Sequence, residues 1–349
     1  MERKLASIQK IEEIRPIIGA DRIEMARVLG WQCVVKKDDY RVGDWVIYVE
    51  IDALIPRAQY SEFLFKAASK KIYKLKTQKF KGQISQGLII PLSSLNIRHE
   101  LIIPLSYWKD FSMLNIGDDV SIFLEITKYE PAVPVTRGWK VRSLFPKYFP
   151  KTNELRIQSF PDLLKEVEGK EVYISTKLDG TSMTAYLFDG HFGVCSRNLE
   201  LEENPDNPMW KITQELNLKE KLLTAGMEYA IQGELVGPGV AKNPLNLKKL
   251  EWFIFNVFDI KGYKYLDFLD FRKFCFDMGL TTVPIEGVTV AKNWSIEQLL
   301  ERAKGLYIGT NNQKEGVVIR PLKESQVETL GNRLSFKVIN NDILLKGSD

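Results

Sequence analysis

Several short segments in the second half of the chain combine residue types that suit chemistry on a phosphate ester. One segment holds Lys177, Asp179 and Gly180, a second ends at Glu234, and a third begins at Glu315. A lysine amine is a nucleophile once it has lost its proton, and carboxylates at strand ends suit a hydrated divalent cation. These residues favour attack by lysine on a nucleoside triphosphate. The remaining segments centre on Arg197, Phe258 and Lys337.

Each candidate residue also has a purely structural interpretation. Lys177 precedes a glycine that allows a tight turn close to a ligand, but an exposed lysine at a strand corner fits equally well. Glu234 and Glu315 suit a metal or a ribose hydroxyl, or they lie in solvated turns. The order of the segments favours the functional interpretation over the structural one.

Arginine, aromatic and lysine side chains complete the set of candidates. Arg197 and Arg320 offer planar guanidinium groups for phosphate or ribose oxygens, although Arg320 also suits an ion pair on an edge strand. Phe258 is placed to lie under a base or to pack in the core. Lys337 is an amine for the triphosphate or an ordinary surface lysine.

Composition narrows the classes of protein. The chain has 349 residues, enough for two domains, and a net charge of +4 that permits a polyanionic partner. Three widely spaced cysteines favour reduced thiols and an intracellular, cytoplasmic location. With two histidines, a structural zinc site and histidine-based catalysis are disfavoured. No apolar run reaches the ~18 to 20 residues of a membrane span.

The first half of the chain predicts a small β-barrel of the OB type. Short runs rich in β-branched and aromatic residues alternate with turn signals up to about residue 125, including expected strands at 84–91 and 119–124. A lysine-rich insertion lies at 57–82. It suits either the backbone of a nucleic acid or a solvated face. The candidate RNA-binding residues in it are Lys70, Lys71, Lys74 and Lys76.

The second half predicts a mixed α+β domain. Five prolines between 130 and 161 favour a linker and an irregular lead-in. Expected strands and helices then follow one another without an internal repeat. The expected strands are 171–176, 184–188, 229–234, 252–260, 315–321 and 333–338, and the expected helices are 207–223, 267–278 and 295–304.

The order of these motifs resembles the covalent nucleotidyltransferase superfamily of ATP-dependent nucleic-acid ligases and mRNA capping enzymes. Within it, the chain is most similar to Deinococcus-type ATP-dependent RNA ligases, whose OB module precedes the catalytic domain. Segments 42–50, 82–88 and 150–158 support that choice. The resemblance implies an OB-like domain at 1–128, a linker and lead-in at 129–160, and an adenylyltransferase domain with antiparallel sheets at 161–349.

The resemblance also implies the chemistry. Lys177 attacks ATP and carries AMP, the AMP passes to an RNA 5′-phosphate, and a 3′-hydroxyl displaces it to seal the strand. Mg²⁺ or Mn²⁺ is the expected cofactor, held by Glu234 and Glu315 through water, and the expected partner is a nicked RNA duplex bound by a monomer. The catalytic residues carried over are Lys177, Asp179, Glu234, Glu315 and Lys337, and the nucleotide-binding residues add Thr176, Gly180, Arg197 and Phe258.

Two positions depart from the family pattern, and three rival functions stay open. Thr176 stands where relatives often have an acidic residue that reads the base, and Ser335 with Lys337 replaces a pair of lysines. A GTP-dependent capping guanylyltransferase would also form a lysine adduct, but its OB domain normally follows the catalytic domain. A DNA ligase is a second rival. The third is a nucleic-acid-binding module without catalysis, which would form no adduct.

Overall fold

The computed structural model describes residues 3–98, 114–129 and 139–346, and these form two compact units. Unit 1 contains the described residues up to 129, Gln158–Pro161 and the end of the chain from Leu344. Unit 2 contains residues 139–157 and Asp162–Ile343. The central part of the predicted linker, with Pro131 and Pro134, lies outside the described residues.

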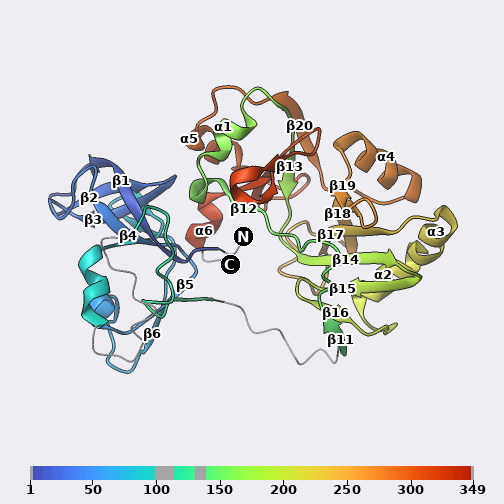
Figure 1. Ribbon diagram of the computed structural model, residues 1–349, viewed down its shortest axis with the longest axis horizontal. Helices are drawn as coiled ribbons and strands as arrows, with labels where there is room; N and C mark the ends of the chain where they lie inside the picture. The colour runs from blue at the N-terminus through green and yellow to red at the C-terminus, as the bar shows by residue number, and fades with distance from the viewer. Residues whose placement is uncertain (1–2, 99–113, 130–138, 347–349) are drawn as a thin grey trace. The chain divides into compact units, whose positions relative to one another are not determined.

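Unit 1 is built on an antiparallel sheet with the order β3-β2-β1-β4-β9 (Figure 1). The long strand β1 pairs with β4 through its first half and with β2 through its second. The pairing with β2 contains a bulge between Ile11 and Glu13. A second sheet has the order β10-β5-β6. Apolar side chains from both sheets form one core, as predicted for an OB-like module. The strands are β1 (Ala6–Pro16), β2 (Ile23–Val28), β3 (Trp31–Lys36), β4 (Trp45–Val49), β5 (Ala53–Pro56), β6 (Ile72–Lys74), β9 (Leu88–Pro91) and β10 (Thr127–Lys128).

Two expected strands of unit 1 are altered. The strand expected at 119–124 is absent, because Asp119 forms only an isolated bridge with Ser7. The Ser121 hydroxyl accepts a hydrogen bond from the Ala6 amide (2.9 Å). This side-chain bond takes the place of a backbone bond between two strands. The strand expected at 84–91 divides at Gly87, which has a φ of 120° and lies against the Tyr48 ring. The insertion contains η1 (Gln59–Leu64), β6 and the hairpin of β7 (Gln78–Phe80) and β8 (Gln83–Ser85), and η2 (Leu92–Arg98) follows β9.

The larger sheet of unit 2 has the order β11-β16-β15-β14-β17-β18-β19 and is antiparallel throughout. One face packs against helices α2, α3 and α4 (Figure 1), because Met183, Ile231 and Ile254 share a core with the apolar sides of these helices. The strands are β11 (Val141–Leu144), β14 (Thr181–Phe188), β15 (His191–Cys195), β16 (Leu199–Leu201), β17 (Tyr229–Val236), β18 (Glu251–Asp259) and β19 (Lys264–Tyr265), and the helices are α2 (Pro208–Glu215), α3 (Leu218–Ala225) and α4 (Phe268–Met278).

The smaller sheet of unit 2 has the order β12-β24-β21-β13-β20. Its one parallel pair joins β12 to β24. The proline-rich lead-in therefore contributes β12 to this sheet and β11 to the larger sheet. The sequence analysis missed both strands. The strands are β12 (Leu155–Arg156), β13 (Glu171–Lys177), β20 (Ile285–Val290), β21 (Gly316–Pro321) and β24 (Phe336–Ile339). The other elements are α1 (Leu163–Val167), α5 (Ile296–Arg302), α6 (Asn341–Lys346), η6 (Ile157–Ser159), η7 (Glu328–Leu330), β22 (Gln326–Val327) and β23 (Asn332–Arg333).

The register of the smaller sheet aligns several basic residues. On β13, Lys177 is paired with Gly316 of β21, and Ser175, two residues earlier, is paired with Val318 of β21. Val318 is in turn paired with Lys337 of β24. Lys337 is also paired with Arg156. Paired residues, and residues two apart along a strand, share one face of a sheet. Lys177, Lys337 and Arg156 therefore lie on the same face.

The predicted helices are confirmed with one division. The expected helix at 207–223 breaks into α2 and α3 because Asn217 adopts a left-handed conformation with φ 49°. Asn207 caps α2 by accepting a bond from the Met209 amide, and Ser295 caps α5 by accepting one from the Gln298 amide. Among the described residues, none of the helices is both long enough and apolar enough to cross a membrane.

A methyl group at Gly316 should disrupt the smaller sheet. Gly316 has a φ of 152°, and a Cβ there would collide with the Val338 carbonyl oxygen on β24. We expect Gly316→Ala to lower the free energy of unfolding by roughly 3 kcal/mol, from overpacking and backbone strain together. Gly331→Ala is the control, because Gly331 is left-handed with open space around it and should lose only ~1 kcal/mol. Equal losses in denaturant titrations of the two variants would contradict this account.

Candidate active site

Lys177 ends strand β13 and faces a carboxylate on the neighbouring strand. Its Nζ lies 2.6 Å from Oε2 of Glu315, the residue immediately before β21. The antiparallel pairing of Lys177 with Gly316 places the two side chains at the same end of the sheet. Both side chains are largely buried, with 24% and 18% exposure, so the ion pair is only partly screened by water.

Glu234 is brought to the same site from the other sheet. Gly180 lies against β17, where a Cβ would collide with the Leu235 carbonyl oxygen and meet Cγ of Glu234 at 3.0 Å. The Gly180 amide also donates a hydrogen bond to the Glu234 carboxylate. A glycine is therefore required at position 180 for close approach of the two segments. The structure thus brings together Lys177, Asp179, Gly180, Glu234 and Glu315, as the motif order predicted.

The surrounding carboxylates hold Lys177 in its charged form. Burial lowers the pKa of this amine, but the charges of Glu315 and Glu234 outweigh burial, and the pKa of Lys177 is raised above its usual value. The nucleotide-free site therefore stores an ammonium, which is not a nucleophile. Attack by Lys177 requires that the ion pair with Glu315 first be opened.

The same crowding raises the pKa values of the acidic groups. Burial is the largest cause at Glu234 and, with the charge of Glu315, outweighs the opposing charge of Lys177 to raise its pKa to about 7. Burial and Glu315 also raise the pKa of Asp179, against the opposing charges of Lys177 and Lys242. One lysine thus faces three carboxyl groups, which leaves the site with an excess of negative charge.

Tyr307 is a site residue that the sequence analysis missed. Its hydroxyl accepts hydrogen bonds from the amides of Asp179 and Glu315 and donates one to the Lys177 carbonyl oxygen, each at 3.1 Å. One side chain therefore ties the corner after β13 to the corner before β21. Nothing in the local sequence singles out this tyrosine, because its role depends on contacts more than a hundred residues away along the chain.

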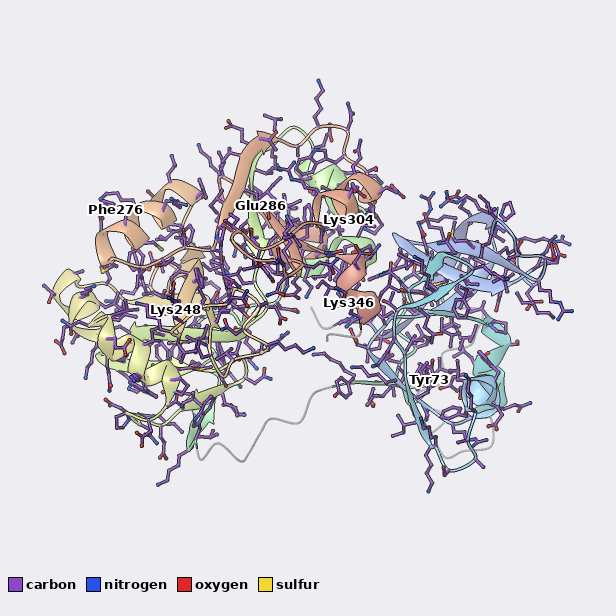
Figure 2. The ribbon with its side chains drawn as sticks, turned by 180° about the vertical axis from the view of Figure 1, so that it is seen from behind. Tyr73, Lys248, Phe276, Glu286, Lys304 and Lys346 are labelled. Atoms are coloured by element: carbon purple, nitrogen blue, oxygen red, sulfur yellow. The ribbon has the colours of Figure 1, made fainter. Side chains whose placement is uncertain are left out.

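Thr176 is held by a charged pair on the opposite side of the strand. Its hydroxyl donates to Oε1 of Glu286 (2.8 Å), and the Lys314 ammonium lies 2.7 Å from both oxygens of the same carboxylate. Glu286, labelled in Figure 2, lies on β20. Consecutive residues of a strand point to opposite faces, so the Thr176 side chain points away from Lys177. The nucleotide-binding role predicted for Thr176 therefore stays a prediction, and its hydroxyl is engaged by Glu286.

Arg320 is a structural residue rather than a phosphate ligand. Its side chain is 2% exposed, pairs with Glu154 at 2.6 Å, and donates to Ser335 Oγ (2.9 Å) and to the Phe255 carbonyl oxygen (3.1 Å). Its strand, β21, lies between β24 and β13, so the predicted edge position is also wrong. Burial raises the pKa of Glu154, but Arg320 and Arg333 outweigh it and bring the value to about 2.

Phe255 rather than Phe258 shares a cluster with the residue that follows Lys177. Phe258 is 2% exposed and packs in a core with Phe145 and Tyr186. Phe255 instead packs, partly exposed, in a separate cluster with Leu178 and Tyr307, directly beneath the Lys177 corner. The sequence analysis named only Phe258. In the ladder between β17 and β18, Gln232 is paired with Asn256 and Gly233 with Ile254, so Phe255 is the extra residue of a bulge in β18.

The remaining candidates are dispersed. Arg197 is exposed in the turn between β15 and β16, and it forms no hydrogen bond or ion pair with any described residue. Lys337 is half-buried on the same face as Lys177. In unit 1, Lys70, Lys71 and Lys76 are exposed, whereas Lys74 lies 3.5 Å from the centre of the Tyr129 ring.

The acidic groups fit a hydrated divalent cation. Carboxylate oxygens suit Mg²⁺ and Mn²⁺, and a cation would offset the negative excess around Lys177. Within residues 3–98, 114–129 and 139–346, no three acidic, histidine or cysteine side chains are arranged to hold a metal ion directly. The fit is therefore to an ion that keeps much of its water, with Glu234 and Glu315 as the nearest protein ligands.

Comparison with known proteins agrees with this arrangement. A family model described as RNA ligase matches residues 170–339, and one described as an OB-fold domain matches residues 5–92. Solved structures of an RNA ligase from Naegleria gruberi are similar over almost the whole chain. The form with pyrophosphate is 32% identical, with 99% of each chain covered and a TM-score of 0.85.

Two further forms of the Naegleria enzyme contain nucleotides. A variant with ATP and manganese is 32% identical, covering 99% of this chain and 100% of the other, with a TM-score of 0.86. A variant with AMP and manganese is 31% identical, with 99% of each chain covered and a TM-score of 0.85. No curated protein sequence matches the chain.

Removing the charge of Glu234 should change how stability depends on pH. Its pKa of about 7 in the folded protein exceeds the ordinary 4.5, so ionisation destabilises the fold. That destabilisation is absent below about pH 4.5 and complete above about pH 7. We expect Glu234→Gln to be more stable than the wild type by roughly 3 kcal/mol at pH 8 and equally stable near pH 4.5. Glu215→Gln, an exposed helical substitution, is the control. Identical pH profiles of unfolding for all three proteins would refute this assignment.

Removing the Tyr307 hydroxyl should leave the backbone at Asp179 and Glu315 less firmly positioned. Tyr307→Phe leaves the Asp179 and Glu315 amides without their acceptor, which should cost about 1–3 kcal/mol of stability. Misplacement of Lys177 should slow its modification by ATP by about tenfold. Tyr263→Phe is the control because Tyr263 is 66% exposed. A Tyr307→Phe protein with wild-type melting temperature and rate of modification would disprove the proposed role.

Proposed function

The chain belongs to the ATP-dependent RNA ligase family, as the order of its motifs predicted, and we propose that it seals RNA through a lysyl-AMP intermediate on Lys177. The observation that carries the proposal is the convergence of one buried amine with Glu315, Glu234 and Asp179 at the meeting point of two sheets. Few reactions other than nucleotidyl transfer to lysine use that set.

In the first step the Lys177 amine attacks the α-phosphorus of ATP and releases pyrophosphate. Glu234 and Glu315 would hold Mn²⁺ or Mg²⁺ through water, and that ion supplies positive charge for the phosphoryl oxygens. Side chains of the protein position the other groups in this step. Tyr307 accepts hydrogen bonds from the amides of Asp179 and Glu315. Gly180 allows close approach of β17, which carries Glu234, and Phe255 packs in the cluster that contains Leu178. We assign contact with the base to Phe255 rather than Phe258. Lys337 shares the face of Lys177 and suits the triphosphate.

In the later steps the AMP moves to an RNA 5′-phosphate, and a 3′-hydroxyl then displaces it. The natural substrate is inferred to be a nicked duplex bound by one copy of the chain. Unit 1 supports this proposal with the exposed lysines Lys70, Lys71 and Lys76, whereas Lys74 is engaged by Tyr129 and contributes less. An intracellular location stays a prediction, supported by three buried cysteines without disulfides.

Labelled nucleotides test the proposal. Wild-type protein incubated with α-labelled ATP and a divalent cation should acquire label on Lys177, and Lys177→Met should acquire none. Lys170→Met, at an exposed position before β13, is the matched control and should be labelled normally. The labelled protein should then seal a nick with a 3′-hydroxyl and a 5′-phosphate in an RNA strand.

Three results would contradict the proposal. Label that survives in Lys177→Met would place the chemistry elsewhere. Preferential labelling by GTP would indicate a capping-type enzyme, and sealing of DNA nicks but not RNA nicks would indicate a DNA ligase.

A further inference from the structure

The connection between β17 and β18, residues 237–250, carries positive charge that the chemistry above does not use. We call it the lysine loop. Its three lysines, Lys242, Lys248 (Figure 2) and Lys249, are all exposed. None of them forms an ion pair or hydrogen bond with another residue in the part of the chain that the structure describes. Lys248 and Lys249 therefore present ammonium groups without a neutralising partner, whereas the charge of Lys242 acts on Asp179.

The backbone of the lysine loop is held by side chains as well as by backbone hydrogen bonds, which include an isolated bridge between Gly237 and Val240. The Asn243 side chain donates to the Leu247 carbonyl oxygen (2.9 Å) and accepts from the Leu247 amide (3.0 Å). Asn312 donates to the Pro244 carbonyl oxygen at 2.7 Å. Three residues of the loop, Ala241, Asn243 and Asn246, take up left-handed conformations. A loop fixed in this way loses little conformational entropy when a ligand binds.

The lysine loop is also anchored beside the reactive amine. Leu245 and Leu247 pack in the same cluster as Leu178, the residue directly after Lys177, and Tyr307. Lys242 is close enough to Asp179 for its charge to oppose the rise in the Asp179 pKa that burial and Glu315 cause. Lys242 thus lies near a site whose own groups are mainly acidic, and Lys248 and Lys249 belong to the same anchored loop.

The chemistry of the loop distinguishes between its possible ligands. Flexible lysine ammonium groups neutralise phosphates without reading sequence, and the loop exposes no aromatic side chain on which a base could stack. The acidic centre beside it would repel a nucleic-acid backbone unless nearby cations attract the strand. A solvated surface without a ligand would not require a backbone fixed by Asn243 and Asn312.

We propose that the lysine loop binds the phosphate backbone of the RNA strand whose 5′-phosphate receives AMP from Lys177. This inference rests on the proposed function and assigns one surface of unit 2 to its substrate. The loop holds the RNA and does not take part in the first step with ATP.

A charge-removal experiment separates these roles. The test protein carries Lys242→Gln, Lys248→Gln and Lys249→Gln. The control protein carries Lys211→Gln, Lys219→Gln and Lys292→Gln, which remove the same charge at exposed positions elsewhere in unit 2. Three quantities are measured for both and for the wild type: the rate and KM of modification by ATP alone, the KM for a nicked RNA duplex, and the dependence of RNA binding on salt.

We expect the test protein to react with ATP within twofold of the wild type and to show a KM for RNA at least tenfold higher. Each phosphate contact contributes about 0.7–0.9 to the slope of log affinity against log salt, so losing three contacts should reduce that slope by about 2. The control protein should match the wild type in all three measurements.

Other outcomes overturn the proposal. Equal RNA affinities and salt slopes for the test and control proteins would show that the loop does not bind RNA. A raised KM for ATP with unchanged RNA binding would assign the loop to the triphosphate instead. If the wild type forms the adduct with ATP but seals no RNA, the proposed function itself fails and the loop proposal fails with it.

Discussion

The ion pair between Lys177 and Glu315 is the interaction on which the rest of the site depends. A lysine surrounded by Glu315, Glu234 and Asp179 is stabilised as an ammonium, so the nucleotide-free protein keeps its nucleophile protonated. Under the proposed mechanism, this arrangement would keep the amine unreactive until a nucleotide and its cation bring positive charge to the site. A buried pair of this kind contributes little net stability, which suggests that it is retained for chemistry.

The fold positions that pair through register and close backbone approach. Antiparallel pairing aligns the end of β13 with the start of β21, and Gly316 permits contact with β24. Gly180 brings in the strand carrying Glu234, and Tyr307 ties the two corners together with three hydrogen bonds. The site is therefore built from residues at the ends of strands. Leu245 and Leu247 of the lysine loop pack in the cluster that contains Leu178 and Tyr307.

The sequence was sufficient to predict the α+β architecture and the OB-like first half. It also named residues that the structure brings together, Lys177, Glu234 and Glu315, whose functional roles stay a prediction. Lysine, glycine and glutamate in a defined order carry chemical meaning that survives without coordinates. The sequence was insufficient where a role depends on distant contacts. Tyr307 binds the Lys177 carbonyl oxygen far along the chain, and Arg320 is buried by a pairing with Glu154 in the lead-in. The position of Phe255 depends on a bulge in β18. Strands β11 and β12 were also missed, because proline content does not reveal that a segment pairs at the edge of a sheet.

A site-resolved titration of Lys177 tests the central claim most directly. The side-chain NMR signals of isotope-labelled lysines can be followed from pH 8 to pH 10.5 in the nucleotide-free protein, with the Lys177 signal identified by its loss in Lys177→Arg. The account predicts that the Lys177 signal titrates at a higher pH than an ordinary lysine side chain, because the pKa of Lys177 is raised. A Lys177 signal that titrates before those of the exposed lysines would contradict it.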